Sequence, residues 1–308
     1  MRGTQFARPE ERIGMSRWLP LVLFLIGLPH KSAGQIRADA RLVLVPVSVT
    51  DRRGATVNGL DRSNFTVFED KAPQPIAAFC AEDAPTSVGL IFDTSGSMRD
   101  KLGAAKTALR TFASNANSAD EAFLFTVSTR PDVSSAFTSD LGALVEKAHL
   151  LTASGDTALI DTIYAGLERM RSASNPRRAL LILSDGMDNH SRRSRSELMR
   201  LAMEADVQIY AIRVDSRVRT KKAIEQQEEQ RGLAFLQDLA ENTGGLHFTI
   251  SDWEDADRVV AKAVLSMRNQ YLLAYYPAQP LQPGKWHRIS VKLNVTHTNV
   301  YARSGYSE

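Results

Sequence analysis

The chain has 308 residues, of which 43% are apolar and 24% are charged. This composition is typical of a globular protein and excludes a disordered chain, and the length allows one large domain or two smaller ones. Cys80 is the only cysteine, so an intramolecular disulfide and a cysteine-based zinc site are excluded. The 38 basic and 35 acidic residues give a formal net charge of +3.

The first 34 residues have the organisation of a secretory signal peptide. Four arginines precede an apolar run at residues 18–28, and the small residues 32–34 follow it. The run has about 11 residues, whereas a helix needs about 20 to cross a bilayer. We therefore predict a signal peptide over residues 1–34 and an exported protein, periplasmic or extracellular, that starts near Gln35. Met15 is an alternative start, because the segment after it contains the same apolar core.

The net positive charge lies in this predicted leader. Residues 1–34 contain five basic and two acidic residues, so the leader accounts for the whole formal charge of +3. The mature chain is then formally neutral. Any attraction for an acidic partner has to come from a local site rather than from the whole surface.

Strand-like patterns occur near both ends of the mature chain. Apolar residues alternate with others over residues 43–49 and 288–295. Shorter strand-like runs accompany them at residues 65–69, 76–79, 271–276 and 300–303, with turns predicted at 51–54 and 70–75. Neither end alone offers enough strands for a two-layer core. We therefore predict that residues 40–80 and 270–308 pair into one small β-sandwich.

Between these ends, strands and helices alternate along the sequence. Apolar runs without alternation, typical of buried parallel strands, lie at residues 88–92, 122–127, 179–183 and 207–212. Apolar residues at helical spacing lie between them, for example Leu159, Ile163 and Leu167. The pattern predicts a doubly wound α/β domain with a mostly parallel sheet. The charged stretch 217–231 is predicted to be a solvated helix.

Oxygen-bearing side chains follow two of the predicted strands. Asp93, Ser95 and Ser97 come directly after the run 88–92, and Asp185 follows the run 179–183. Thr157 opens a predicted helix over residues 157–170, although a helix N-cap is an alternative role for Asp156 or Thr157. Ligands of open α/β sheets bind at the carboxyl ends of strands, and hard oxygen donors suit Mg²⁺.

Together these residues resemble the metal-ion-dependent adhesion site of the von Willebrand factor type A domain. That site uses an Asp-x-Ser-x-Ser loop, a Thr from a second loop and an Asp from a third. The resemblance covers residues 86 to about 268 and implies a Rossmann-like fold with the metal at the top of the sheet. It implies that the metal ligands are Asp93, Ser95, Ser97, Thr157 and Asp185. Thr is commoner than Ser184 before the last Asp, but serine supplies the same hydroxyl.

The flanking segments resemble the VWFA-related family that is typical of secreted acidobacterial proteins. The matching motifs are residues 47–51, 59–60, 64–70, 270–271, 275–277, 286–287 and 303–306. With this resemblance the chain divides into four predicted regions. They are a signal peptide (1–34), an N-terminal β segment (35–85), a type A domain (86–268) and a C-terminal β segment (269–308) that pairs with the second region.

The resemblance implies protein binding or adhesion rather than catalysis. A Mg²⁺ ion in such a site keeps an open position for an Asp or Glu side chain of a partner protein, and Mn²⁺ and Ca²⁺ are alternatives. A structural or assembly component of the cell envelope, whose metal only stiffens the fold, is a second hypothesis, and a hydrolase is a third. The partner's identity and the oligomeric state stay open.

Motifs for other functions are missing from the sequence. It contains no Gly-x-Ser-x-Gly elbow, no His-Glu-x-x-His motif, no glycine-rich phosphate loop and no basic-aromatic stripe for nucleic acid. Asp93-Thr94-Ser95-Gly96 is similar to the Asp-Thr-Gly of aspartic proteases. The inserted Ser95 and the α/β context argue against that activity.

Residues next to the motifs are predicted to have ordinary roles. We expect Asp161 to be an exposed helix charge and His190 to lie at the rim of the site without binding metal. Arg192, Arg193 and Arg195 are predicted to form a solvated helix start, and steering of acidic partners is the alternative.

Overall fold

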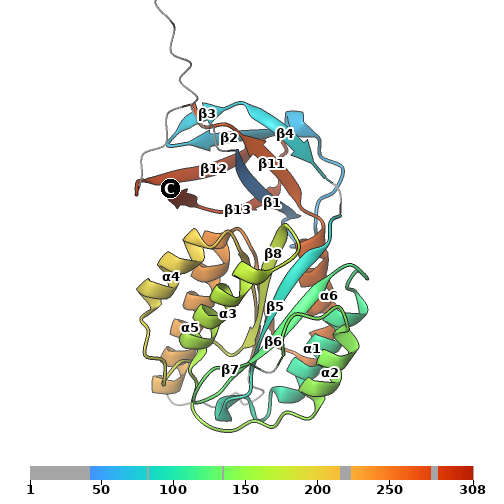
Figure 1. Cartoon of the computed structure of the whole chain (residues 1–308), viewed down its shortest axis with the longest axis vertical. Helices are drawn as coiled ribbons and strands as arrows, with labels where there is room; N and C mark the ends of the chain where they lie inside the picture. Colours follow the sequence, from blue (N-terminus) through green and yellow to red (C-terminus); the bar gives the residue numbers. More distant parts are fainter. Residues whose placement is uncertain (1–41, 82, 134, 216–222, 279–283, 308) are drawn as a thin grey trace, which may run out of the picture. The chain divides into compact units, whose positions relative to one another are not determined.

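A computed structural model describes residues 42–81, 83–133, 135–215, 223–278 and 284–307 (Figure 1). These residues all belong to one unit, Asp39–Glu308. The predicted signal peptide and its cleavage site lie outside the described residues. Within the described part of the chain, no helix combines the length and the apolar character that crossing a membrane requires.

The predicted α/β fold is confirmed as a sheet with helices on both faces (Figure 1). Its strands, in sheet order, are β10 (His247–Ile250), β9 (Gln208–Val214), β8 (Arg177–Ser184), β5 (Thr86–Asp93), β6 (Glu121–Val127) and β7 (Asp132–Val133). All are parallel except the edge strand β7. The four predicted runs correspond to β5, β6, β8 and β9. Strands β7 and β10 are too short for a sequence pattern to reveal them.

Each face of this sheet is covered by three helices. One face packs against α1 (Leu102–Ser114), α2 (Leu141–His149) and α6 (Ala256–Arg268). The other packs against α3 (Leu159–Arg169), α4 (Arg195–Glu204) and α5 (Ala223–Thr243). Short 3₁₀ turns occur at η1 (Arg62–Asn64), η2 (Gly96–Met98), η3 (Met170–Ser172) and η4 (Trp253–Asp255). Burial on both faces explains why the central strands read as continuous apolar runs.

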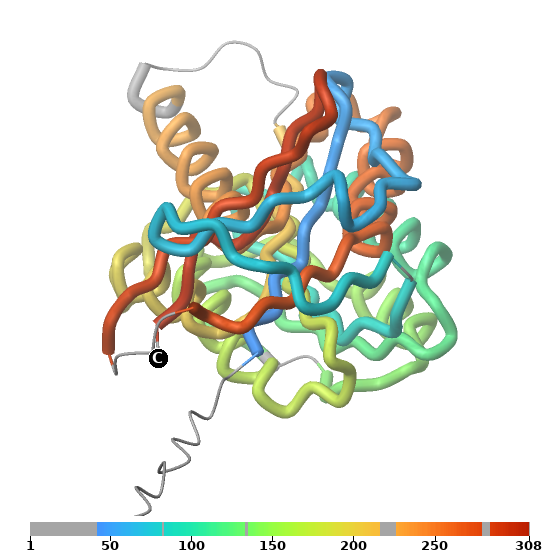
Figure 2. Tube along the Cα trace, turned by 90° about the horizontal axis from the view of Figure 1, so that it is seen from above, coloured from blue at the N-terminus to red at the C-terminus, as the bar shows by residue number. Residues whose placement is uncertain are grey.

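The two ends of the chain form two further antiparallel sheets. The first has the order β13 (Thr298–Ala302), β1 (Val43–Asp51), β11 (Tyr271–Tyr275) and β4 (Ile76–Cys80). The second has the order β14 (Gly305–Ser307), β12 (Trp286–Leu293), β2 (Phe65–Glu69) and β3 (Ala72–Gln74). Figure 2 shows β1 beside the C-terminal strands with which it pairs. Segments from both ends therefore build each sheet, as predicted.

The two sheets enclose one apolar core. Val45 and Val49 of β1 and Leu273 of β11 are fully buried, and they share a cluster with Phe65 and Ile289 of the other sheet. The alternation in the sequence follows from this packing, because every second side chain of a strand faces the core. The predicted boundaries at residues 34, 85 and 268 stay predictions.

Two local predictions are wrong. Residues 70–75 are not all a turn: the turn is confined to Asp70 and Lys71, which have positive φ values of 47° and 72°, and β3 follows at once. The helix predicted over residues 157–170 begins only at Leu159, with Ala158 as its N-cap and no side-chain capping bond. Thr157 is therefore not a helix cap, so its side chain is free for another role.

Candidate metal centre

The sheet topology brings the two predicted ligand loops after β5 and β8 together. These strands are parallel neighbours, with Phe92 paired to Leu183. Asp93 ends β5, and Asp185 follows directly after β8. Because the strands run parallel, both carboxylates emerge at the same edge of the sheet.

The first loop is organised around Asp93. This side chain is fully buried, and its Oδ1 accepts the backbone N–H of Ser95 at 2.9 Å. Its Oδ2 accepts the hydroxyl of Ser184 at 2.5 Å. The hydroxyl oxygens of Ser95 and Ser97 lie 3.1 Å apart. The loop thus gathers a carboxylate and two hydroxyls within a few ångströms.

Backbone hydrogen bonds hold the Thr157 loop against the other two loops. The N–H of Gly96, in the first loop, donates to the carbonyl of Gly155 at 2.9 Å. The Thr157 carbonyl accepts the N–H groups of Asn189 and His190, both at 3.0 Å, and its own N–H donates to Asn189 Oδ1 at 2.8 Å. Thr157 is only 3% exposed. Three separate segments are therefore tied into one cluster.

The third loop contains Asp185, which has a partner that sequence reasoning missed. Lys101, just before α1, places its Nζ 2.6 Å from Asp185 Oδ2, and both side chains are almost fully buried. Asp185 Oδ1 accepts the N–H of Met187 at 3.1 Å. The sequence contains no signal for this pair, since Lys101 ends a run of charged residues that looks like an exposed turn.

The electrostatics of the cluster favour a bound cation. Burial, and next to it the negative charge of Asp185, raise the pKa of Asp93 to about 6. Hydrogen bonds from Ser184 and Ser95 act in the opposite direction. Two buried carboxylates that repel each other are stabilised by a positive charge between them. Carboxylate and hydroxyl oxygens also form the donor set that hard divalent ions prefer. The residues present therefore fit such an ion.

Asp161 corrects a prediction, because it is buried rather than exposed. Its side chain lies in the first turn of α3, with 9% of the residue exposed. Its two oxygens accept the backbone N–H groups of Arg192 and Arg193 at 3.0 and 3.1 Å. Nearby, Asp188 Oδ2 accepts the N–H of Ile160 at 2.9 Å. These carboxylates fasten the loop after β8 to the start of α3.

His190 lies at the surface beside the loops. Its side chain is 47% exposed, and its Nδ1 is 3.6 Å from Asp156 Oδ2. The predicted solvated helix start is confirmed, because Arg192, Arg193 and Arg195 are all exposed and α4 begins at Arg195. Arg193 lies over the ring of Tyr164 and Arg195 over the ring of Phe235, at 3.9 and 4.8 Å from the ring centres. Both ring contacts hold the loop in position, while the two arginines still place positive charge at the surface.

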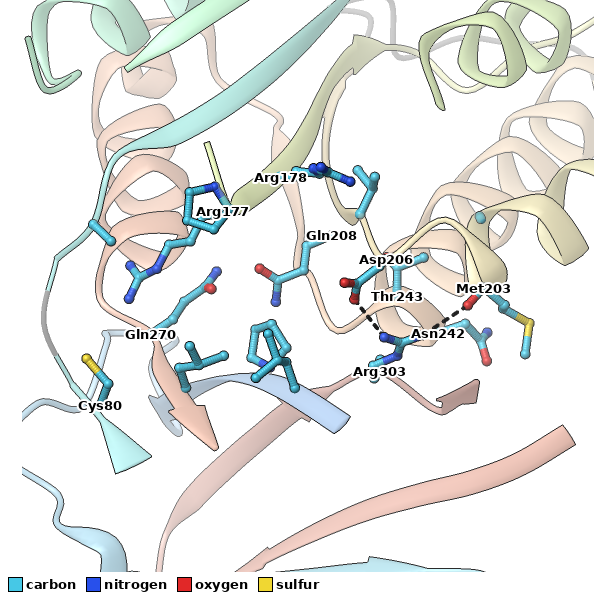
Figure 3. Close-up of a pocket in the computed structure, with 17 residues that line it drawn as sticks. Cys80, Arg177, Arg178, Met203, Asp206, Gln208, Asn242, Thr243, Gln270 and Arg303 are labelled. Atoms are coloured by element: carbon cyan, nitrogen blue, oxygen red, sulfur yellow. Dashed lines mark hydrogen bonds and ion pairs between the residues drawn. The ribbon is translucent and has the colours of Figure 1, made fainter. Parts of the chain in front are cut away.

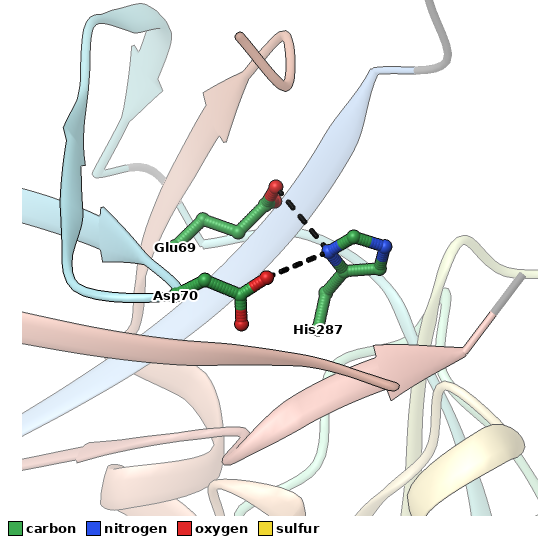
Figure 4. A group of neighbouring side chains, drawn as sticks. All are labelled: Glu69, Asp70 and His287. Carbon is green, nitrogen blue, oxygen red and sulfur yellow. Dashed lines mark hydrogen bonds and ion pairs between the residues drawn. The ribbon is translucent and has the colours of Figure 1, made fainter. Parts of the chain in front are cut away.

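A second group of ligand-type side chains lies in the β-sandwich. Glu69, Asp70 and His287 have ligand atoms that all fall within 4.8 Å of one another (Figure 4). His287 Nδ1 is 3.0 Å from Asp70 Oδ2, whereas its buried Nε2 has no hydrogen-bond partner. Metal-bound histidines normally donate their other N–H to an acceptor. The contacts therefore favour a structural hydrogen bond between His287 and Asp70 rather than a metal site, next to the hydroxyls of Tyr275 and Tyr306, which both donate to Glu69.

A cavity of about 150 Å³ lies at the other end of β8 (Figure 3). It is lined by side chains of the first β-sheet, including Leu44 and Leu272, and by Arg178 at the start of β8. The carboxylate in its wall, Asp206, is paired with Arg303 at 2.6 Å. Its lining is mostly apolar, so it does not offer the oxygen cluster of the three loops.

The α/β sheet and the three oxygen-bearing loops define the class of domain to which the central part of the chain belongs. Residues 88–187 match the model of the von Willebrand factor type A domain family. The predicted resemblance is thereby confirmed. The narrower assignment to a family of secreted acidobacterial proteins stays a prediction. No curated protein sequence matches the chain.

Several solved structures are similar to the chain at low identity. The conserved hypothetical protein BatB from Bacteroides thetaiotaomicron is 14% identical, with 60% of this chain and 98% of that chain covered and a TM-score of 0.46. The vWF domain of the type V pili tip protein Mfa5 from Porphyromonas gingivalis is 12% identical (61% and 96% covered, TM-score 0.49). A von Willebrand factor type A protein from Catenulispora acidiphila is 13% identical (86% and 74% covered, TM-score 0.49).

Proposed function

We propose that the chain is an exported, metal-dependent protein-binding module that captures an acidic group of a partner protein. The observation that supports the proposal is the pair of buried carboxylates, Asp93 and Asp185, which three tied loops surround with hydroxyl groups. Asp93, Ser95, Ser97, Thr157 and Asp185 are the proposed ligands, and Mg²⁺ is the proposed ion, with Mn²⁺ and Ca²⁺ as alternatives.

The ion's chemistry would be electrostatic. Once bound, it would add two positive charges to a site that contains two carboxylates and the Lys101 ammonium, which leaves a formal net charge of +1, and it would offer an open position for a carboxylate oxygen. Asp93 and Asp185 would hold the charge, while Ser95, Ser97 and Thr157 would contribute neutral oxygens. The hydrogen bond from Ser184 to Asp93 keeps that carboxylate oriented.

Binding without turnover is the proposal because Asp93, the carboxylate that contacts hydroxyls of the site, is itself a proposed metal ligand, and among the described residues no histidine is hydrogen-bonded to these hydroxyls. In the described residues, the Ser95 hydroxyl contacts Ser97, and nearby His190 contacts Asp156 at the surface. A nucleophile requires a base within hydrogen-bond reach and a group that orients that base. Neither pair supplies this arrangement.

Partner capture with and without metal tests the proposal. The parent protein is immobilised and exposed to the native exported fraction, first with EDTA and then with MgCl₂. We expect proteins that are retained only with MgCl₂, and their loss in Asp93→Ala and Asp185→Ala. Asp100→Ala is the matched control, because this exposed aspartate follows the first loop without a role in the site.

The possible outcomes separate the hypotheses. Capture that is the same for both variants and the parent contradicts the adhesion proposal. If MgCl₂ raises the melting temperature of the parent but leaves capture unchanged, the metal only stiffens the fold, and the structural hypothesis replaces adhesion. Export is tested separately by sequencing the N-terminus of the protein recovered outside the cytoplasm, which we expect near Gln35.

A further inference from the structure

An ammonium group is paired with one of the two buried carboxylates of the proposed metal centre. Asp93 is fully buried, Asp185 is 2% exposed, and Lys101 is 5% exposed. Lysine is rarely buried this deeply unless it is paired. Its Nζ lies 2.6 Å from Asp185 Oδ2, a distance typical of a strong charge-assisted hydrogen bond.

The backbone keeps Lys101 at this place. Its N–H donates to the carbonyl of Met98 at 2.9 Å, and its carbonyl accepts the N–H of Ala105 at 3.1 Å in the first turn of α1. The side chain therefore reaches Asp185 from the start of a helix that is packed on the sheet. The fold therefore fixes the position of the ammonium, because both the N–H and the carbonyl of Lys101 are hydrogen-bonded.

We infer that Lys101 is the internal cation of the metal-free site, and that it competes with the divalent ion for Asp185. This inference rests on the proposed function, since it concerns the same carboxylates. Asp185 Oδ2 is engaged by Lys101 and Oδ1 by the N–H of Met187. An ion at Asp185 would add two positive charges a few ångströms from the ammonium. Like charges repel strongly in a buried setting, so Lys101 has to release the carboxylate.

The consequence is a site that keeps its shape without metal and binds metal weakly. Lys101 neutralises one of the two carboxylates, so the loops do not need the ion to stay together. It also sets the metal concentration at which the site fills. Lys101 is thus an affinity-determining residue, and the partner-binding state would follow the free metal concentration outside the cell.

Replacing Lys101 by methionine tests this role in the full mature chain. Calorimetric titration with MgCl₂ alone is compared for the parent, Lys101→Met and Lys106→Met. Lys106 is the matched control, because it lies on the same helix but its Nζ donates to the carbonyls of His149 and Leu151 at 2.7 Å rather than to a carboxylate. Thermal unfolding in EDTA is measured for the same three proteins.

We expect Lys101→Met to bind Mg²⁺ at least about tenfold more tightly than the parent, because the competing charge is gone. In EDTA we expect it to melt at a lower temperature, because Asp185 is left unpaired. Lys106→Met should keep the parent's affinity. If Lys101→Met does not fold in EDTA, circular dichroism during a MgCl₂ titration should show folding below the concentration that half-saturates the parent.

Two other results would contradict the inference or the proposed function. An unchanged or weaker Mg²⁺ affinity of Lys101→Met overturns the inference and makes Lys101 a support of Asp185 rather than its competitor. If neither the parent nor Lys101→Met binds Mg²⁺, Mn²⁺ or Ca²⁺, the proposed metal centre itself fails. The two failures are therefore distinguishable.

Discussion

Gly186 is a position at which a single methyl group should directly disturb the proposed metal centre. It follows Asp185, and its φ is +81°, in the left-handed region that favours glycine. A Cβ there would lie 2.8 Å from both the carbonyl carbon and the oxygen of Gly232 in α5. Neither atom belongs to a flexible side chain, so the backbone of the loop or of the helix would have to move.

Two contributions determine the size of the effect of Gly186→Ala. A left-handed backbone conformation costs a residue with a Cβ about 1–2 kcal/mol. Overpacking against backbone atoms costs about 1–3 kcal/mol more, since a backbone shift is needed. We therefore expect the free energy of unfolding to fall by about 2–5 kcal/mol. The affinity for Mg²⁺ should fall with it, because Asp185 is the preceding residue.

Two other alanine variants separate these contributions in urea unfolding experiments. Gly232→Ala creates the same close approach from the other side, with its Cβ 2.6 Å from the carbonyl oxygen of Gly186, but without positive φ. Its free energy of unfolding should fall only by the overpacking contribution, about 1–3 kcal/mol. Gly103→Ala adds a methyl group on α1 with nothing within 4 Å, so it should be more stable than the parent by about 0.5–1 kcal/mol. A Gly186→Ala protein as stable as the parent would refute the reasoning.

Three further predictions concern Ser184, Tyr275 and His247. Ser184→Ala should weaken Mg²⁺ binding about 10–100-fold in calorimetry, because the 2.5 Å bond that orients Asp93 is lost, and Ser184→Thr should retain binding. Equal affinities of the two variants would contradict this. Tyr275→Phe should lower the free energy of unfolding by about 1.5–3 kcal/mol, since its hydroxyl donates to Glu69 at 2.6 Å in the buried sandwich core. Burial lowers the pKa of His247 in the folded protein. As the pH falls below about 6.5, the unfolded chain therefore binds a proton at this histidine before the folded chain does, and the free energy of unfolding decreases. His247→Phe should lose less stability than the parent between pH 7.5 and 5.5, and parallel losses would be inconsistent with this cause.

Local patterns along the chain predict the elements of the fold well. The alternation at residues 43–49 and 288–295 and the continuous runs before Asp93 and Asp185 reflect which faces of each strand are buried. Strands β7 and β10 are not predictable in this way, because a strand of two to four residues is too short to show a repeating pattern of apolar residues. The exact turn at Asp70 and Lys71 is not predictable either, since two residues other than glycine adopt positive φ only because the hairpin that contains them requires it.

The candidate site likewise has a part that the sequence predicts and a part that it does not. Asp93 and Asp185 are predictable as residues of one sheet edge, because a carboxylate directly after a buried parallel strand emerges there. That they belong to one site was implied by the family resemblance, and the pairing of β5 with β8 makes their loops neighbours. The surroundings of these carboxylates are not predictable. Asp161 and Lys101 both look exposed in the sequence, and both are buried through contacts with segments 31 and 84 residues away.

The sequence by itself therefore determined the strands, the helices and the oxygen donors at the strand ends, because these depend on residues that are close together along the chain. Only the tertiary structure decided how charge is distributed in the site. Whether a lysine or an aspartate is solvated or buried depends on which distant segments pack against it, and this packing made Lys101 the counter-ion of Asp185.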